Sequence, residues 1–101
     1  MKVALLSNNE TDEIVALGLK LASAADDVKG ENIRLLDLRG RCAYTDVMLF
    51  VSGASDRQVR AIGDRISKRA NELGMPTIGH EGSQSGNWVL ADHGDVVVHV
   101  F

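Results

Sequence analysis

The clearest structural pattern in this chain lies in residues 88–101, which read Trp88-Val89-Leu90-Ala91-Asp92-His93-Gly94-Asp95-Val96-Val97-Val98-His99-Val100-Phe101. The apolar, β-branched run over residues 96–101 predicts a buried strand. The four residues before it are typical of a turn in which Gly94 adopts a positive φ. Residues 88–91 predict another strand, so this segment contains two strands and the turn between them.

The only tryptophan of the chain, Trp88, follows the polar segment Gly82-Ser83-Gln84-Ser85-Gly86-Asn87. A tryptophan in this position anchors either the core or a partner protein. The core interpretation is supported by the scarcity of aromatic residues, which make up 4% of the chain. The partner interpretation is supported by the polar loop beside it, and the pattern alone leaves both open.

Residues 11–29 predict an amphipathic helix, because apolar residues recur at three- and four-residue steps: Ile14, Leu17, Leu21, Ala24 and Val28. A capping box of Ser7 and Glu10 would start it, or else Asn9 or Thr11 would cap it. Lys29 and Gly30 supply a basic last turn and a C-terminal glycine. Residues 32–39 predict a strand covered on both faces, because apolar residues occur at both its odd and its even positions. Residues 46–52 predict a second, more hydrophobic strand.

A second helix is predicted after Ser55, which forms a capping box with Gln58. Its apolar stripe consists of Val59, Ile62, Ile66, Ala70 and Leu73, and Gly74 and Pro76 end it. Three short strands are predicted near residues 77–80, 88–91 and 96–101. The order α-β-β-α-β-β-β predicts an α+β (mixed α/β) fold, with a small mixed five-stranded sheet packed against helices. At 101 residues, the chain is expected to form a single domain over residues 1–101.

The composition limits the classes of partner. A net charge of −3 and a pI of about 5.5 argue against free nucleic acid as the principal ligand. The one cysteine, Cys42, cannot form an intramolecular disulfide and is interpreted as a small buried hydrophobe in a reducing compartment. No apolar run approaches the ~20 residues of a membrane span, and the start of the chain is too short for a signal-peptide core. A cytoplasmic location is therefore expected, with no membrane partner.

Three groups of residues are candidate sites of chemistry. The turn Gly53-Ala54-Ser55-Asp56 joins a strand to a helix, where phosphates bind in some proteins, but N-capping by Ser55 explains it better. Asp92, His93, Asp95 and His99 could suggest a metal site, although polar turn and sheet residues are the favoured interpretation. The basic residues of the second helix are interpreted as a solvated face with local ion pairs, such as Asp64 with Lys68. No metal or cofactor is expected.

Three segments, in a fixed order, carry a resemblance to a known family. The first is residues 32–40, Asn-Ile-Arg-Leu-Leu-Asp-Leu-Arg-Gly. The second is Thr45-Asp46 followed by Ser52-Gly53-Ala54-Ser55-Asp56-Arg57-Gln58-Val59. The third is Glu81-Gly82, Trp88-Val89-Leu90, Asp92 and residues 94–101. Over residues 28–101 these segments resemble the ribosomal silencing factor (RsfS, or Iojap-like) family. The chain departs from that pattern at Val47-Met48, where members usually have aromatic residues, and it lacks their usual charged, Tyr-containing tail.

The resemblance implies a nucleotidyltransferase-like fold without the catalytic carboxylates, and therefore a protein that is not an enzyme. Members of the family bind ribosomal protein fourteen of the large ribosomal subunit and sterically block subunit joining, which represses translation, and some form homodimers. The tryptophan at the matching position meets that ribosomal protein. The resemblance thus assigns partner binding to Trp88, Val89, Leu90, Asp92, His93 and Asp95.

Two other functions remain open at this point. The first is a nucleotide-binding transferase that uses the turn from Gly53 to Asp56 and would bind nucleotide with magnesium. The second is a generic dimeric adaptor that uses an exposed strand edge, and it would dimerise without affinity for ribosomes.

Overall fold

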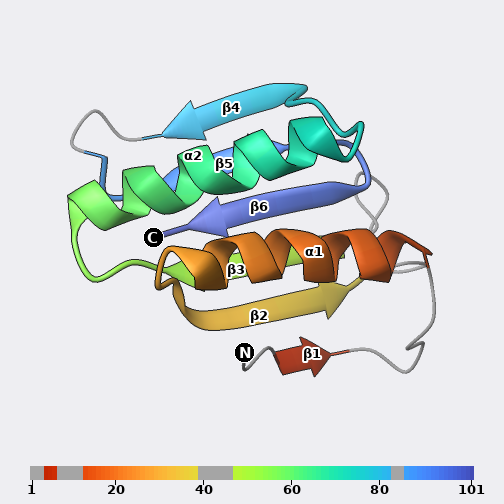
Figure 1. Cartoon of the computed structure of the whole chain (residues 1–101), viewed down its shortest axis with the longest axis horizontal. Helices are drawn as coiled ribbons and strands as arrows, with labels where there is room; N and C mark the ends of the chain where they lie inside the picture. Colours follow the sequence, from red (N-terminus) through yellow and green to blue (C-terminus); the bar gives the residue numbers. More distant parts are fainter. Residues whose placement is uncertain (1–3, 7–12, 39–46, 83–85) are drawn as a thin grey trace.

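The computed structural model describes residues 4–6, 13–38, 47–82 and 86–101 (Figure 1). Along the chain these form β1 (Ala4–Leu6), α1 (Glu13–Asp27), β2 (Glu31–Asp37), β3 (Val47–Ser52), α2 (Asp56–Glu72), β4 (Gly79–Gly82), β5 (Val89–Asp92) and β6 (Val96–Val100). The strands make one sheet in the order β1-β2-β3-β6-β5-β4. The predicted α+β fold is confirmed: its five strands are β2 to β6, and β1 is an additional edge strand.

The sheet is mixed, and its centre joins segments that are distant in sequence. The central strands β3 and β6 run parallel, with Val47 opposite Val96. β2 pairs antiparallel with β3, β5 antiparallel with β6, and β4 antiparallel with β5. β1 pairs parallel with β2.

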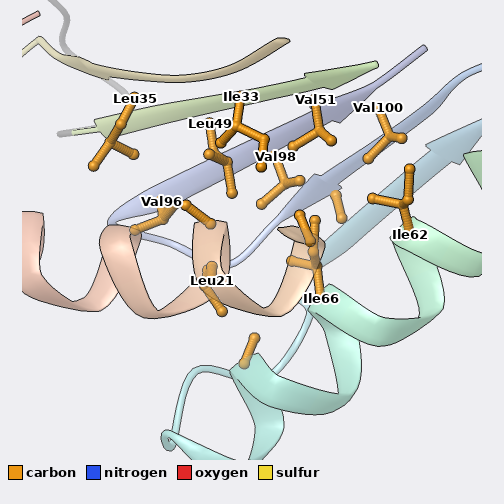
Figure 2. Packing of buried hydrophobic residues seen from close by; sticks show 14 of the residues in the cluster. Leu21, Ile33, Leu35, Leu49, Val51, Ile62, Ile66, Val96, Val98 and Val100 are labelled. Atoms are coloured by element: carbon orange, nitrogen blue, oxygen red, sulfur yellow. The ribbon is translucent and has the colours of Figure 1, made fainter. Parts of the chain in front are cut away.

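Both helices cover the same face of the sheet (Figures 1 and 2). The core between the two layers is aliphatic and includes Leu21, Ile33, Leu35, Leu49, Val51, Ile62, Ile66, Val96, Val98 and Val100. In Figure 2 the strand side chains of this set point toward α1 and α2. Because the chain has few aromatic residues, this face is filled by branched side chains that suit a pleated surface.

The prediction that residues 32–39 are covered on both faces is wrong. In β2, Ile33 and Leu35 are buried, whereas Arg34 is exposed and Leu36 is half-buried. The reason is that α1 and α2 pack on one face only. The side chains on the other side, here called the open face, include Arg34, Leu36, Phe50, Glu81, Leu90, His99 and Phe101.

Helix α1 is confirmed, with bounds inside the predicted ones. Its end differs from the prediction: Lys29, at a φ of 63°, takes the left-handed conformation, while Gly30 donates its N–H to the Ala25 carbonyl at 2.8 Å. The chain therefore reverses one residue before the glycine. The start signals Ser7, Asn9, Glu10 and Thr11 lie outside the described residues, and so does Cys42.

Helix α2 begins at the predicted capping box. Ser55 Oγ accepts a hydrogen bond from the Gln58 N–H at 3.1 Å, and Gln58 Oε1 accepts one from the Ala54 N–H at 2.7 Å. The Gln58 amide also donates to the carbonyls of Val28 and Lys29, at 3.2 and 3.0 Å. This side chain thus ties the start of α2 to the end of α1.

The turn between β5 and β6 has the predicted chemistry. Gly94 adopts a φ of 85°, and its N–H donates to Asp92 Oδ1 at 2.8 Å. This is an Asx-type turn, in which the aspartate side chain replaces a backbone acceptor. The strand predicted at residues 77–80 begins later, at Gly79, and the Ile78 N–H already donates to the Asp92 carbonyl at 2.7 Å. In the part of the chain that the structure describes, no helix is long and apolar enough to cross a bilayer.

Candidate protein-interaction surface

Trp88 lies at the surface, immediately before β5, with 42% of its area exposed. β5 and β6 are antiparallel with Val89 opposite Val100, so this register places Trp88 beside Phe101. Phe101 is also exposed, at 55%. Two large apolar side chains therefore meet solvent at the same end of the sheet. This arrangement is typical of an interface anchor rather than of a core residue.

The two residues after Trp88 point to opposite faces, as successive strand residues must. Val89 packs toward α2 and the core: a Cβ built on Gly63 of that helix would lie 3.5 Å from Val89 Cγ1. Leu90 is half-buried on the open face, where it lies opposite His99 on one side and Glu81 on the other. Leu90 therefore extends the apolar surface of Trp88, whereas Val89 supports it from inside.

The polar residues that follow have different roles. Asp92 is half-buried and accepts the Gly94 hydrogen bond, and Asp95 is exposed. His93 is only 4% exposed, and its Nδ1 lies 3.0 Å from the Met75 carbonyl. The His93 ring therefore bonds the β5–β6 turn to the segment after α2, and its position suits donation of an Nδ1–H to that carbonyl. Its side chain is not part of the accessible surface.

On the open face, His99 stacks on Phe50, with ring centroids 4.8 Å apart and planes inclined by 16°. Its Nε2 is buried and has no hydrogen-bond partner among the residues that the structure describes. Burial lowers the pKa of His99 below its usual value of 6.5, because the charged imidazolium loses hydration there. His99 behaves on this face as a flat, neutral, largely apolar group.

At the turn from Gly53 to Asp56, two N–H groups are engaged within the fold. Ser55 caps α2, as the sequence indicated. The Gly53 N–H donates to the Phe101 carbonyl at 2.8 Å, and the Ala54 N–H donates to Gln58. A phosphate cradle needs such N–H groups free to point at the ligand. Here they are used within the fold.

The other residues considered for chemistry do not converge. Among the described residues, no three His, Cys, Asp or Glu side chains are grouped closely enough to hold a metal. On α2, Arg65 pairs with Asp27 at 3.3 Å and Arg69 with Glu72 at 3.7 Å. These are partly exposed pairs of the kind that contributes little to stability.

Sequence reasoning missed a groove beside Trp88. It has a volume of about 720 Å³ and lies between α2 and the β4–β5 pair. Arg60, Asp64 and Ser67 line it from α2, His80 lines it from β4, and Trp88 also lines it. Positions 60, 64 and 67 share one face of a helix, so the sequence indicated that these three polar side chains lie together.

The chain resembles a set of regulatory proteins. Residues 11–101 match the family model described as "Ribosomal silencing factor during starvation". A ribosomal silencing factor of Bacillus subtilis is 46% identical over 84 residues, which cover 82% of this chain and 71% of that protein. One from Chromobacterium violaceum is 40% identical over 91 residues, covering 90% and 72%. The chloroplastic Iojap protein of Zea mays is 29% identical over 89 residues, covering 88% and 39%.

Solved structures show the same fold. A crystal structure of a Chromobacterium violaceum protein superposes with a TM-score of 0.82 at 38% identity, covering 89% of this chain and 75% of that one. A Bacillus halodurans structure gives a TM-score of 0.75 at 38% identity, covering 90% and 82%. These similarities define the class as small α+β proteins with helices on one face of a mixed sheet. Within this class, the chain belongs to the ribosomal silencing factor family.

Proposed function

We propose that this protein binds the large ribosomal subunit through ribosomal protein fourteen and sterically blocks subunit joining, so that translation is repressed. The observation that carries the proposal is the exposed Trp88 beside exposed Phe101, in a chain of the ribosomal silencing factor family. The protein would act in the cytoplasm, where ribosomes are, and would need no cofactor.

The chemistry of the surface suits a basic protein partner. Trp88 and Leu90 supply apolar area that can be desolvated, and Asp92 and Asp95 supply an acidic rim. A net charge of −3 favours approach to a basic ribosomal protein and disfavours non-specific contact with RNA. The side chains of Val89 and His93 support this surface from inside.

Enzymatic transfer of a nucleotide has less support. The N–H groups of Gly53 and Ala54 are engaged within the fold, so these two donors are not free to bind a phosphate. We therefore propose a binding protein that is not an enzyme.

Co-sedimentation with separated large and small ribosomal subunits tests the proposal. Wild type should be retained on the large subunit alone. Trp88→Ala should reduce retention, because truncation of an interface anchor weakens the free energy of binding by ~2 kcal/mol or more. Trp88→Phe should lose less, because it keeps an aromatic ring.

Asp92→Asn tests the acidic rim, since its remaining Oδ1 can still accept the Gly94 hydrogen bond. Asp56→Asn, on the first turn of α2, is the matched control for loss of one negative charge. If retention falls with Asp92→Asn and not with Asp56→Asn, the result supports a role for the acidic rim in partner binding. Equal retention of wild type and Trp88→Ala would refute the proposed surface, and magnesium-dependent nucleotide binding would favour the transferase.

We also propose that the protein forms a homodimer through its open face. The register of the sheet places five residues in one row across this face: Arg34, Phe50, His99, Leu90 and Glu81. A basic residue ends the row on β2 and an acidic residue ends it on β4, about 19 Å apart at the usual strand spacing. Neither forms an ion pair within the described residues.

Such a row is complementary to itself. A two-fold axis along β6 would place Arg34 of one copy over Glu81 of the other, and Phe50 over Leu90, as an isologous contact requires. A hollow of about 510 Å³ between Arg34, Phe50 and Phe101 would receive side chains of the second copy. Since Leu90 belongs to both surfaces, a dimer of this kind and the ribosome complex would exclude each other.

Charge exchange tests the dimer. Sedimentation equilibrium should show that Arg34→Glu and Glu81→Arg each weaken self-association and that the double variant restores it. Arg57→Glu, at an exposed position on α2, should have no effect. A double variant that stays as monomeric as the single variants would contradict this arrangement.

A further inference from the structure

The segment that leads into Trp88 is packed against α2 at a single glycine. Gly86 is buried and has a φ of 79°. A Cβ built on it would lie 3.1 Å from both Cγ and Cδ of Arg60, and closer still to Arg60 Nη1. The Arg60 side chain therefore lies directly over the Gly86 Cα. Both the backbone conformation and the space require glycine at this point.

Arg60 is itself carried by a firmly held part of α2. Two residues before it, Gln58 bonds to the carbonyls of Val28 and Lys29. Two residues after it, Ile62 is fully buried in the core. One residue further on, Gly63 allows the helix to lie against Val89 of β5. The position of the Arg60 backbone is thus fixed relative to the sheet.

These contacts bracket Trp88 in the chain. Gly86, two residues before it, is covered by Arg60, and Val89, one residue after it, is packed against Gly63. The same helix face therefore fixes the backbone on both sides of the exposed indole. Val89 is also paired in the sheet with Gly82 and Val100, whereas Gly86 precedes β5. The Arg60 contact therefore restrains the backbone at Gly86, ahead of the first paired residue of β5.

We infer that Arg60 is a positioning residue, which orders the backbone at Gly86 and so holds Trp88 in its binding orientation. The inference rests on the proposed function of Trp88 as a partner anchor. A side chain that is already ordered loses less conformational entropy on binding, so the affinity of a pre-organised anchor is higher. Cγ, Cδ and Nη1 of Arg60 all make this contact, and we assign the restraint to the methylene stem.

The lone tryptophan allows a direct measurement on the free protein. Time-resolved fluorescence anisotropy of Trp88 should show a larger fast component in Arg60→Ala than in wild type. Arg60→Met keeps Cγ and a sulfur in place of Cδ, so it should retain most of the wild-type anisotropy. Arg57→Ala removes the same charge from an exposed position of the same helix and should leave the anisotropy unchanged. Thermal unfolding of each variant checks that it is folded.

Binding to the large ribosomal subunit supplies the second readout. Arg60→Ala should weaken retention by about threefold to tenfold, the range expected when one ordered side chain becomes free. In a Trp88→Ala background, Arg60→Ala should cause no further loss, because its effect acts through Trp88.

Three results would overturn the inference. The first is wild-type anisotropy in folded Arg60→Ala. The second is an anisotropy in Arg60→Met as low as in Arg60→Ala, which would exclude the stem as the restraint. The third is an equal loss of retention with and without Trp88, which would make Arg60 a direct partner contact. If Trp88→Ala alone leaves retention unchanged, the proposed function fails, and the anisotropy experiment still tests the role of Arg60.

Discussion

The side chain of Gln58 is predicted to be one of the strongest single links between the two helices. It makes three hydrogen bonds: Oε1 accepts from the Ala54 N–H at 2.7 Å, and Nε2 donates to the carbonyls of Val28 and Lys29 at 3.2 and 3.0 Å. Gln58→Ala removes all three. Each bond contributes about 0.5–1.5 kcal/mol net, and partial exposure places these at the lower end of that range.

The expected loss is therefore about 1.5–2.5 kcal/mol, after the slightly better helix propensity of alanine is subtracted. For a protein of this size, such a loss lowers Tm by roughly 6–15 °C. Urea unfolding should show a lower midpoint and an unchanged slope, because the surface exposed on unfolding is the same.

Two variants sharpen the test. Gln58→Glu keeps an acceptor for the Ala54 N–H but turns an oxygen toward the carbonyls of Val28 and Lys29, so it should still be clearly destabilising. Arg57→Ala, next to it and exposed, should change stability by less than about 0.5 kcal/mol. A loss below about 0.5 kcal/mol for Gln58→Ala would refute the argument that these bonds join α1 to α2.

Three further predictions follow from burial, turn geometry and titration. Ile66→Ala removes a side chain that is 1% exposed between α2 and the sheet and should cost about 2–5 kcal/mol in urea unfolding, unlike Ile78→Ala at a site that is 73% exposed. Gly94→Ala places a Cβ at a φ of 85° and should cost about 1–2 kcal/mol by the same measurement, and a neutral result would contradict the turn geometry. The pKa of His99 is lower in the folded than in the unfolded protein, so the unfolded chain binds its proton first and stability should fall as pH drops through about 6.5. This part of the pH dependence should disappear in His99→Gln when unfolding free energies are compared from pH 5 to 8, and parallel profiles would refute it.

Local signals in the sequence predicted much of the fold. The capping box of Ser55 and Gln58 and the turn at Asp92 and Gly94 depend on neighbouring residues, and both are formed as expected. The helix stripes also specified which residues are buried, such as Ile62 and Ile66. Each of these features depends on residues close together in the chain, so it can be predicted from a single sequence.

Features that depend on distant segments were not predictable in this way. Apolar residues occur at both odd and even positions of β2. Leu36 is only half-buried because both helices pack on the opposite face of the sheet. The exposure of Trp88 likewise depends on its register with Phe101 across the sheet. The contact of Arg60 with Gly86 joins α2 to a segment on the far side of β4, and no local sequence pattern indicates it.

The central position of β6 has a consequence for how the sheet assembles. β6 separates β3 from β5, and it is made of residues that follow both of those strands in the chain. Until β6 is in place, β3 and β5 each present an unpaired edge, and the valines that complete the core are missing. Closing this gap joins segments far apart in sequence, which slows folding relative to structures built from local contacts. A nascent chain that lacks β6 would hold the three strands β1 to β3 apart from the pair of β4 and β5, so the last strand converts independent pieces into one cooperative unit.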